Sequence, residues 1–253
     1  MKKPIDYSKI ADIYDTYVQE SFDIPFFLNE AERSSGEVLE LTSGTGRVSI
    51  PLLESGIPLT CVDNSPEMLA ILKKKMKEKG LTGSVHQADI RGLSLEKQFD
   101  LIFIPFHSFS ELLSPSDQTR VLTSIYNHLS ESGRFICTLH NPAVRLQTSN
   151  GNLHLFRKVS LPDQTGTILL WGLEDYDPKS QIVHISQFIE IYNSNNVMQI
   201  KHHVDGHYFV HEKETFEELL RSNGYKIIDV YGDYEYSRLD EDKSPFMIWV
   251  LVK

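Results

Sequence analysis

Two patterns of apolar residues alternate along the chain from residue 37 to residue 139. Short apolar runs, typical of buried strands, lie at residues 38–41, 59–62, 84–88, 99–104 and 134–139. Between these runs, apolar residues recur at the spacing of one helix face, as Leu69, Leu72 and Met76 do. Buried strands that alternate with helices predict a parallel sheet with helices on both faces, an α/β fold.

The pattern changes in residues 152–210, which show almost no helical spacing. From residue 181 to residue 192, apolar and polar residues alternate, and a period of two indicates a strand. Turn-forming residues precede and follow this segment. We therefore expect an antiparallel β meander inserted into the α/β fold.

The α/β pattern resumes at Glu214 with a helix that ends at Gly224. Two strands follow, at residues 225–230 and 246–252, with no crossover helix evident between them. They should therefore pair antiparallel. The complete expectation is a Rossmann-like three-layer sandwich, whose seven-stranded, mostly parallel sheet has an antiparallel last strand, plus the inserted meander.

Composition and charge exclude several classes of protein. The 35 acidic and 25 basic residues give a formal charge of −10, which argues against a dedicated nucleic-acid binder. No apolar run approaches the ~18 residues of a membrane span, and the two lysines near the start precede no apolar segment of a signal peptide. Cys61 and Cys137 lie in apolar runs and are expected to be buried thiols. A cytoplasmic protein without a membrane partner is the simplest account.

Three successive predicted strands end in a glycine-rich or acidic signal, where ligands bind to a doubly wound sheet. The first strand leads to Gly44 and Gly46, the second ends at Asp63 and the third at Asp89. Glycines without a Cβ allow a sharp turn and a close approach to a ligand. Asp63 follows Gly44 by 19 residues, a spacing that suits a carboxylate accepting both hydroxyls of a ribose. An NAD site and an adenosyl site both remain open at this point.

Three features favour the adenosyl site. Glu40 lies beside the loop, where its charge would repel a pyrophosphate and attract a cationic ligand. Ser49 stands where the dinucleotide fingerprint has its third glycine. Asp89 adds a carboxylate suited to an adenine amino group. A cationic ligand that contains adenine and no phosphate is S-adenosylmethionine.

The chain resembles the class I S-adenosylmethionine-dependent methyltransferases, and among them the enzymes that act on small molecules. The resemblance extends over essentially the whole chain and is carried by residues 40–47, 62–69, 87–91, 99–102 and 129–134. The N-terminal segment 7–15 and the insertion also resemble these enzymes. Thr42-Ser43 departs from the family's usual Gly-Cys or Gly-Ser, and Thr42 should cost the loop some backbone freedom.

The resemblance implies an enzyme with S-adenosylmethionine as cofactor and assigns residues to it. The residues implied in binding the cofactor are Tyr14, Glu40, Gly44, Gly46, Asp63, Asn64, Met68, Ala88, Asp89, Pro105 and Phe106. Glu40 would lie by the methionine amino group, Asp63 would bind the ribose hydroxyls, and Asp89 the adenine. Tyr14 would cover the cofactor's carboxylate, with its hydroxyl near the transferring methyl as a second role.

The resemblance also suggests a domain organisation. Residues 1–140 and 212–253 would bind the cofactor, and residues 141–211 would form the inserted subdomain that covers the methyl acceptor. Aromatic residues of the insertion could line the acceptor pocket: Trp171, Tyr176, Tyr192, Tyr208 and Phe209.

Methyl transfer to an amine or a hydroxyl requires a group that accepts a proton, for which histidine is suited. His107 and His140 follow the fourth and fifth strands, and His140 is the better candidate for a catalytic base. Binding of the acceptor and a structural role remain alternatives for it. His203, His207 and His211 would share a face only on a helix, so their strand argues against a metal site.

Several alternatives stay open after the sequence alone. The lysine-rich segment 73–77 is expected to be the solvated face of a helix rather than a nucleic-acid site. An NAD-dependent oxidoreductase and a nonenzymatic binding module of the same fold are the competing functions. A small-molecule acceptor is the expected partner, the transferred methyl would go to nitrogen or oxygen, and a homodimer is one alternative for the oligomeric state.

Overall fold

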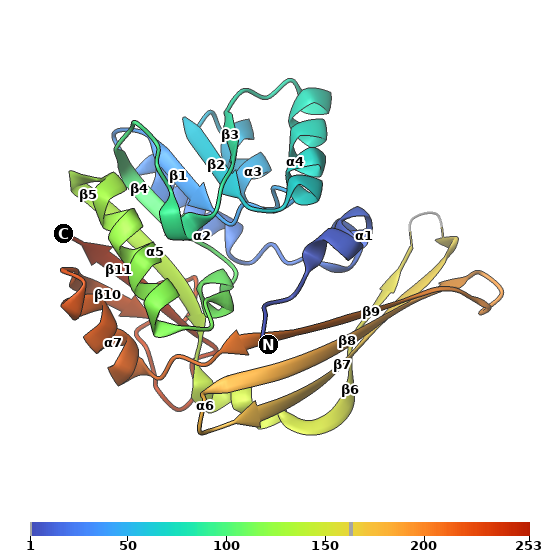
Figure 1. Ribbon diagram of the computed structural model, residues 1–253. Coiled ribbons are helices and arrows are strands. Elements are labelled where there is room, and N and C mark those ends of the chain that lie inside the picture. Colours follow the sequence, from blue (N-terminus) through green and yellow to red (C-terminus); the bar gives the residue numbers. More distant parts are fainter. Residues whose placement is uncertain (1, 162–163) are drawn as a thin grey trace.

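The computed structural model describes residues 2–161 and 164–253. These residues contain two β-sheets (Figure 1). The larger sheet has seven strands. In spatial order they are β10 (Lys226–Tyr231), β11 (Phe246–Val252), β5 (Leu129–His140), β4 (Phe99–Ile104), β1 (Val38–Leu41), β2 (Leu59–Asp63) and β3 (Ser84–Gln87). Only β11 runs antiparallel to its neighbours, β10 and β5. The predicted mostly parallel sheet with an antiparallel last strand is confirmed.

Helices cover both faces of this sheet, because each helix has one apolar side to bury. The helices on one face are α2 (Ile24–Glu32), α3 (Ser49–Glu54) and α4 (Pro66–Lys79), and those on the other are α5 (Pro115–His128) and α7 (Lys213–Ser222). Phe27 and Leu72 belong to the core on the first face, and Leu122 and Phe216 to the core on the second. The three-layer sandwich is therefore built around two apolar cores.

The ends of α4 show how local sequence fixes an element. The Ser65 hydroxyl accepts a hydrogen bond from the amide of Met68 at 3.2 Å, and Pro66 occupies the first turn, where it loses no helical hydrogen bond. Gly80 ends the helix with a φ of 65°, a left-handed conformation that glycine adopts without strain. These caps position the start of α4 beside the end of β2.

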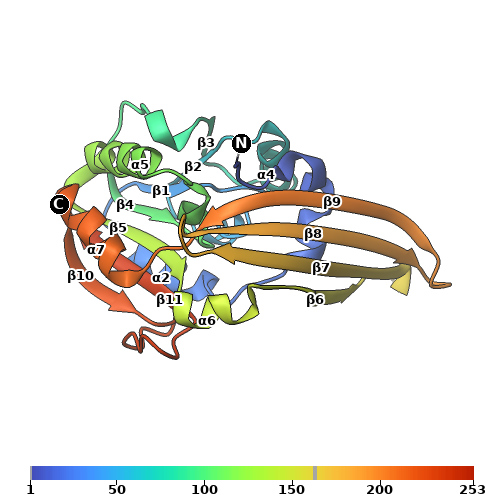
Figure 2. The same ribbon diagram turned by 60° about the horizontal axis from the view of Figure 1, so that its bottom comes forward.

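The smaller sheet contains four antiparallel strands in sequential order. They are β6 (Asn150–Ser160), β7 (Gly166–Asp177), β8 (Ile182–Asn193) and β9 (Met198–Phe209). Together they form a long ribbon that projects beyond the seven-stranded sheet (Figure 2). The expected meander is confirmed. The sequence pattern missed β6 as a separate strand, because its apolar residues Leu153 and Leu155 are about half exposed and show no inward alternation.

An N-terminal segment lies between the two sheets. It contains the short helices η1 (Tyr7–Ile10) and α1 (Ala11–Tyr17), and α1 lies between α4 and the four-stranded ribbon in Figure 1. Ile10 and Tyr17 are buried against Ile168 and Val204 of the ribbon. This segment therefore joins the ribbon to the larger sheet.

Short helices complete the connections. They are η2 (Ile90–Gly92), η3 (Ser108–Glu111), α6 (Pro142–Arg145) and η4 (Leu146–Thr148). Over residues 2–161 and 164–253, none of the helices has the length and the apolar character needed to cross a membrane.

Candidate functional site

The loop after β1, residues 42–47 and here called the glycine loop, turns at the carboxyl end of the parallel sheet. Thr42, Gly44 and Gly46 have φ values of 60°, 53° and 87°, in the left-handed region that is strained for a β-branched residue such as Thr42. A Cβ at Gly46 would lie 2.4 Å from Leu72, whereas a Cβ at Gly44 would meet no atom within 4 Å. The inner side of the loop is therefore packed, and its outer side has room for a ligand.

Asp63 at the end of β2 connects the glycine loop to the start of α4. Its carboxylate accepts hydrogen bonds from the amides of Gly44 and Ser65, both at 2.8 Å. Burial raises the pKa of Asp63, and these hydrogen bonds oppose the shift. A carboxylate has about four acceptor positions, so Asp63 retains capacity for two ligand hydroxyls.

Glu40 lies beneath the glycine loop rather than on its open side. Its side chain is 1% exposed and accepts a hydrogen bond from the Ser49 hydroxyl. Burial raises the pKa of Glu40 to about 8, against the opposing effects of Ser49 and Arg47. The group is therefore largely protonated at neutral pH, and a nearby cation would favour its ionised form.

A buried ion pair that the sequence reasoning missed supports the glycine loop. Arg47 donates two hydrogen bonds to Asp23, at 2.5 and 2.6 Å, and a third to the carbonyl of Glu20 at 2.9 Å. Its guanidinium also lies 4.4 Å from the centre of the Phe106 ring. Arg47 directly follows Gly46 in the sequence, but no local pattern identified Asp23 as its partner.

The N-terminal helix is attached to the same loop. The Thr45 hydroxyl donates to Asp15 of α1 at 2.6 Å, and Lys75 of α4 lies 2.5 Å from Asp15 and donates to the Thr45 carbonyl at 2.9 Å. The expectation that residues 73–77 form only a solvated helix face is therefore wrong for Lys75. The aliphatic side of α4 and its surface lysines are otherwise as expected.

Tyr14 lies between the glycine loop and the interior of the N-terminal segment. Its ring packs edge-on against Tyr7 and Tyr17, with ring centres 5.8 and 5.6 Å apart. Burial raises the pKa of Tyr14, and the charges of Arg47 and Glu111 act on its hydroxyl in opposite directions. Both the lid role of Tyr14 and its contact with the cofactor's carboxylate stay predictions.

The remaining residues predicted for the cofactor border the same sheet edge. Met68 is buried and Asn64 is exposed at the start of α4, and the amide of Ala88 donates to the carbonyl of Asp63 at 3.0 Å. Asp89 is exposed, and its oxygens accept hydrogen bonds from Arg91 of the same turn at 2.5 and 2.9 Å. Arg91 thus competes with any adenine for this carboxylate.

Pro105 and Phe106 lead from β4 toward a second part of the site. Pro105 is buried, and Phe106 and His107 have positive φ values of 55° and 64°. Two successive non-glycine residues in this region store backbone strain of about 1–3 kcal/mol each, which is often found at functional sites. This turn directs His107 toward the end of β5.

A cavity of about 150 Å³ opens at this place, between the strand ends and the ribbon. It is here called the sheet-end cavity. Its lining residues are Ile5, Tyr7, Phe106, His107, Ser110, Glu111, His140, Arg145, Ile185, Gln187, His207 and Tyr208. Of the five aromatic residues of the insertion considered above, only Tyr208 is among them. Trp171 and Tyr192 instead donate hydrogen bonds to Glu190.

His107 and His140 stack face to face in the wall of this cavity, with ring centres 3.6 Å apart. Burial, together with the nearby charge of Arg145, lowers the pKa of His107 to about 3. Burial and the neighbouring His107 also lower the pKa of His140 well below its usual value. Both rings are therefore neutral at physiological pH, and a lowered pKa weakens either one as a general base.

Glu111 and Arg145 are the charged residues of the cavity wall that sequence reasoning missed. Arg145 forms a two-point ion pair with Glu174 of β7, with one contact at 2.6 Å. Burial raises the pKa of Glu111 to about 7, and its carboxylate accepts a hydrogen bond from Tyr7. The only sequence signal for Glu111 was its position shortly after β4, at the end of η3. That position singled out His107 and not Glu111.

The described residues contain no group of three or more His, Cys, Asp and Glu side chains arranged to hold a metal ion. His211 instead packs against the rings of Phe109, Phe209 and Phe216, with centres 4.8–5.4 Å away. His207 lines the sheet-end cavity, and its ring contacts the carbonyl of Lys3 at 3.1 Å.

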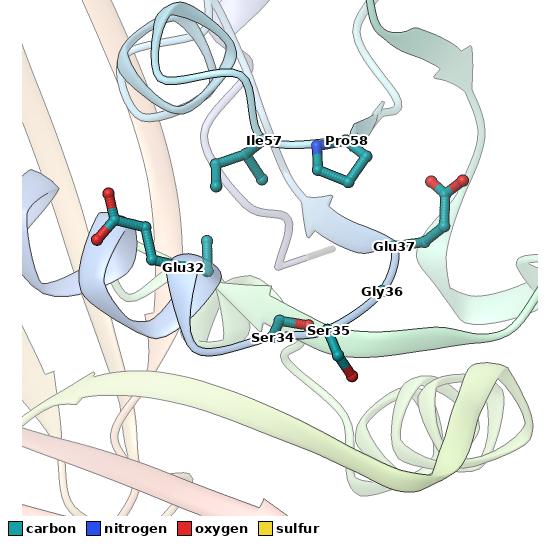
Figure 3. Close-up of a pocket in the computed structure, with 8 residues that line it drawn as sticks. Glu32, Ser34, Ser35, Gly36, Glu37, Ile57 and Pro58 are labelled. Carbon is teal, nitrogen blue, oxygen red and sulfur yellow. The ribbon is translucent and has the colours of Figure 1, made fainter.

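A wider hollow of about 490 Å³ lies at the amino ends of β1 and β2, the opposite ends of these strands from the glycine loop (Figure 3). Its walls are Ser34, Ser35, Gly36, Ile57 and Pro58, with two acidic residues at the rim. One of them, Glu37, forms an ion pair with Lys97 at 2.7 Å. Since ligands of such sheets bind beyond the carboxyl ends of the strands, this hollow is not the candidate site.

Comparison with known proteins agrees with this geometry. A family model described as "Methyltransferase domain" matches residues 38–133, the segment that contains the glycine loop, Asp63 and Asp89. A glycine/sarcosine/dimethylglycine N-methyltransferase from Actinopolyspora halophila is 28% identical over 241 residues, which cover 90% of this chain and 38% of that protein. The chain thus spans well under half the length of this relative.

Two further proteins match over most of their length. A glycine/sarcosine N-methyltransferase from Halorhodospira halochloris is 24% identical over 225 residues, covering 88% of this chain and 78% of that protein. The crystal structure of a S-adenosylmethionine-dependent methyltransferase from Clostridium acetobutylicum ATCC 824 has 19% identity and a TM-score of 0.81, with 97% of this chain and 98% of that chain covered. At this identity the structural likeness shows the shared fold.

Proposed function

Because this chain belongs to the class I S-adenosylmethionine-dependent methyltransferases, we propose that it transfers a methyl group to the nitrogen of a small molecule bound in the sheet-end cavity. The observation that carries the proposal is the junction of two sites. The glycine loop and Asp63 form a corner with an open outer side, and the Tyr14 hydroxyl is close enough to both sites for the charges of Asp63 and of Glu111 to act on its pKa. The names of the curated relatives support nitrogen as the accepting atom.

The residues of the corner fit an adenosyl cofactor. Asp63 would bind the ribose hydroxyls with its remaining acceptor positions, while the outer side of Gly44 leaves room for the cofactor. Ala88, Asp89 and Met68 would border the adenine. The cofactor, when bound, supplies a methyl group on a positively charged sulfur.

Glu40 and Tyr14 would complete the methionine end of the site. Glu40 would respond to the cofactor's positive charge from beneath the loop by ionising, since burial otherwise keeps it protonated. Pro105 and Phe106 would form the wall on the methionine side. Tyr14 would close the site from the N-terminal segment and help exclude water.

The main task of the protein in this reaction is alignment of the acceptor and exclusion of water. The ribbon contributes Ile185, Gln187 and Tyr208 to the cavity. We therefore propose that the inserted segment 141–211 covers the acceptor, and that residues 1–140 and 212–253 hold the cofactor. His140 would shape the acceptor pocket as a neutral ring stacked on His107.

Calorimetry tests the cofactor, and labelled methyl transfer tests the acceptor. S-Adenosylmethionine should bind to the full chain and NAD should not, since an NAD-dependent oxidoreductase is the competing function. A screen of small amines and a metabolite extract with methyl-labelled S-adenosylmethionine should then reveal a labelled product. Binding of NAD without S-adenosylmethionine would reject the proposal, and cofactor binding without transfer to any acceptor would favour the nonenzymatic module.

A further inference from the structure

Glu111 is an acid without a cationic partner in the wall of the sheet-end cavity. Its carboxylate accepts a hydrogen bond from the Tyr7 hydroxyl. Among the ion pairs of residues 2–161 and 164–253, none includes Glu111. The charged group that acts on it most clearly is Asp63, which is another acid. A partly buried carboxylate in this setting is stabilised by a proton or by a cationic ligand.

The cations near the cavity are already occupied by other acids. Arg145 forms its two-point ion pair with Glu174, which is 1% exposed. Arg47 forms the corresponding pair with Asp23, which is fully buried. The two stacked histidines are neutral at physiological pH. Within the part of the chain that the structure describes, the arginine of the cavity wall is therefore already paired, whereas Glu111 has no ion-pair partner.

We propose that Glu111 binds the ammonium nitrogen of the methyl acceptor and removes its proton, and that the acceptor is a small amine without a carboxylate beside that nitrogen. This inference rests on the proposed function. Glycine and sarcosine, which appear in the names of the relatives, carry a carboxylate one carbon from the nitrogen. That carboxylate would meet Glu111 with like charge, and Arg145 of the cavity wall is already paired with Glu174.

The proton and electron balance is simple. The Glu111 carboxylate takes one proton from the ammonium group, which frees the lone pair of the nitrogen. That lone pair forms the new bond to the methyl carbon as the carbon–sulfur bond breaks and leaves its electron pair on sulfur. Glu111 then returns its proton to water. Since burial raises the pKa of Glu111 to about 7, the carboxyl group can gain and lose this proton near neutral pH.

The position of Glu111 favours the acceptor over the cofactor as the source of the cation. The cavity wall that contains Glu111 also contains Ile185, Gln187 and His207 of the ribbon. It contains none of the glycine-loop residues 42–47, and Phe106 is the one residue predicted for the cofactor among its lining residues. The cofactor carries positive charges as well, so the experiment must separate the two ligands.

A matched pair of probes tests the charge preference with the unmodified protein. Glycinamide and glycine have similar size and the same amine, but only glycine has a carboxylate. Each is titrated into the full chain saturated with S-adenosylhomocysteine, and binding is followed by calorimetry and by the ¹³C resonance of the Glu111 carboxyl group. Glycinamide should bind and lower the pKa of Glu111, and glycine should bind at least tenfold more weakly. Equal or tighter binding of glycine, or no binding of glycinamide, would overturn the proposal.

A second experiment identifies which ligand the Glu111 carboxylate binds, the acceptor or the cofactor. Glu111→Gln keeps the shape of the side chain and removes its charge. It should weaken glycinamide at least tenfold and change the affinity for S-adenosylmethionine less than about twofold. The exposed Glu96→Gln substitution is the matched control and should change neither. An equal or larger loss of cofactor affinity in Glu111→Gln would assign this acid to the cofactor and reject the inference, whereas failure of the unmodified protein to bind S-adenosylmethionine would instead reject the proposed function.

Discussion

The corner formed by the glycine loop and Asp63 lies beside the sheet-end cavity. The two regions differ in whether their charged groups have partners. In the corner, Arg47 is paired with Asp23, Lys75 with Asp15, and Asp63 with two backbone amides. In the cavity, Glu111 lacks a cation and the histidine pair is neutral. Apart from Glu40, which burial keeps protonated, the charged groups of the corner have their partners before any ligand binds. In the cavity, the carboxylate of Glu111 has no cationic partner until a bound ligand supplies one.

The largest expected effect concerns the fixed character of the corner. Arg47→Met would leave Asp23 buried without its partner, and this should lower the free energy of unfolding by about 3–5 kcal/mol. Chemical denaturation of the purified protein measures the change. Lys79→Met is the control, because it breaks a pair with Glu54 in which both side chains are about half exposed. That loss should stay below about 1 kcal/mol, and similar losses for both variants would show that the buried pair is not special.

Asp63→Ala addresses ligand binding in the same corner. It would remove two hydrogen bonds to the cofactor and the hydrogen bonds that Asp63 accepts from Gly44 and Ser65. At about 1.5 kcal/mol for each charge-assisted hydrogen bond to the cofactor, affinity for S-adenosylmethionine should fall about 100-fold. Calorimetry measures this loss. Unchanged affinity would refute the assignment of Asp63 to the ribose.

One group from each region, Glu40 and His107, should respond to pH in opposite directions. Glu40 has a pKa raised to about 8 in the folded protein, from an ordinary 4.5. The folded state therefore holds an extra proton between these values, and stability falls as pH rises through 8. His107 has a pKa lowered to about 3 from 6.5. There the unfolded chain binds the extra proton, so stability is present above 6.5 and is lost as pH falls.

Unfolding of the ligand-free protein across the pH range separates these contributions. Glu40→Gln should flatten the alkaline side of the stability profile, and His107→Phe should flatten the acid side, each by on the order of 1–2 kcal/mol. Each variant serves as the control for the other. A profile in which both substitutions affect the same side would show that the assignment of the protonation states is wrong.

The smallest effect is expected at Asp89. Its carboxylate already accepts hydrogen bonds from Arg91 and is exposed to solvent, so Asp89→Asn should change the affinity for S-adenosylmethionine less than about threefold. The comparison with Asp63→Ala, measured by the same calorimetry, tests whether the end of β3 contributes less than the end of β2. A loss as large as that of Asp63→Ala would show that Asp89 leaves Arg91 when the cofactor binds.

Local patterns were sufficient for most of the fold. The spacing of Leu69, Leu72 and Met76 predicted α4, and the absence of a crossover helix predicted the antiparallel pairing of β10 with β11. The pattern failed for β6, since a strand exposed on both faces has no apolar alternation. It also failed for Lys75, which is distinguished from its neighbours only by the position of Asp15 in space.

The site was predictable where it depends on the ends of strands. Gly44, Gly46 and Asp63 lie together because the ends of parallel strands meet at one edge of the sheet. The contacts of Arg47 with Asp23 and of Arg145 with Glu174 join segments 24 and 29 residues apart. No local signal identifies such pairs. The low pKa of His140 likewise follows from its burial and from the stacked His107, which become visible only in three dimensions.

The N-terminal segment has a consequence for the order in which the molecule is assembled. Ile10 and Tyr17 pack in one apolar cluster with Ile168, Ile189 and Val204, which follow them by more than 150 residues along the chain. On a ribosome these early residues must wait until the last ribbon strand has been synthesised. Contacts of such long separation form late, because loop closure precedes any gain from packing. The packing of the N-terminal segment, which contains Tyr7 and Tyr14, would thus form last, after the seven-stranded sheet has begun to collapse around β1 and β4.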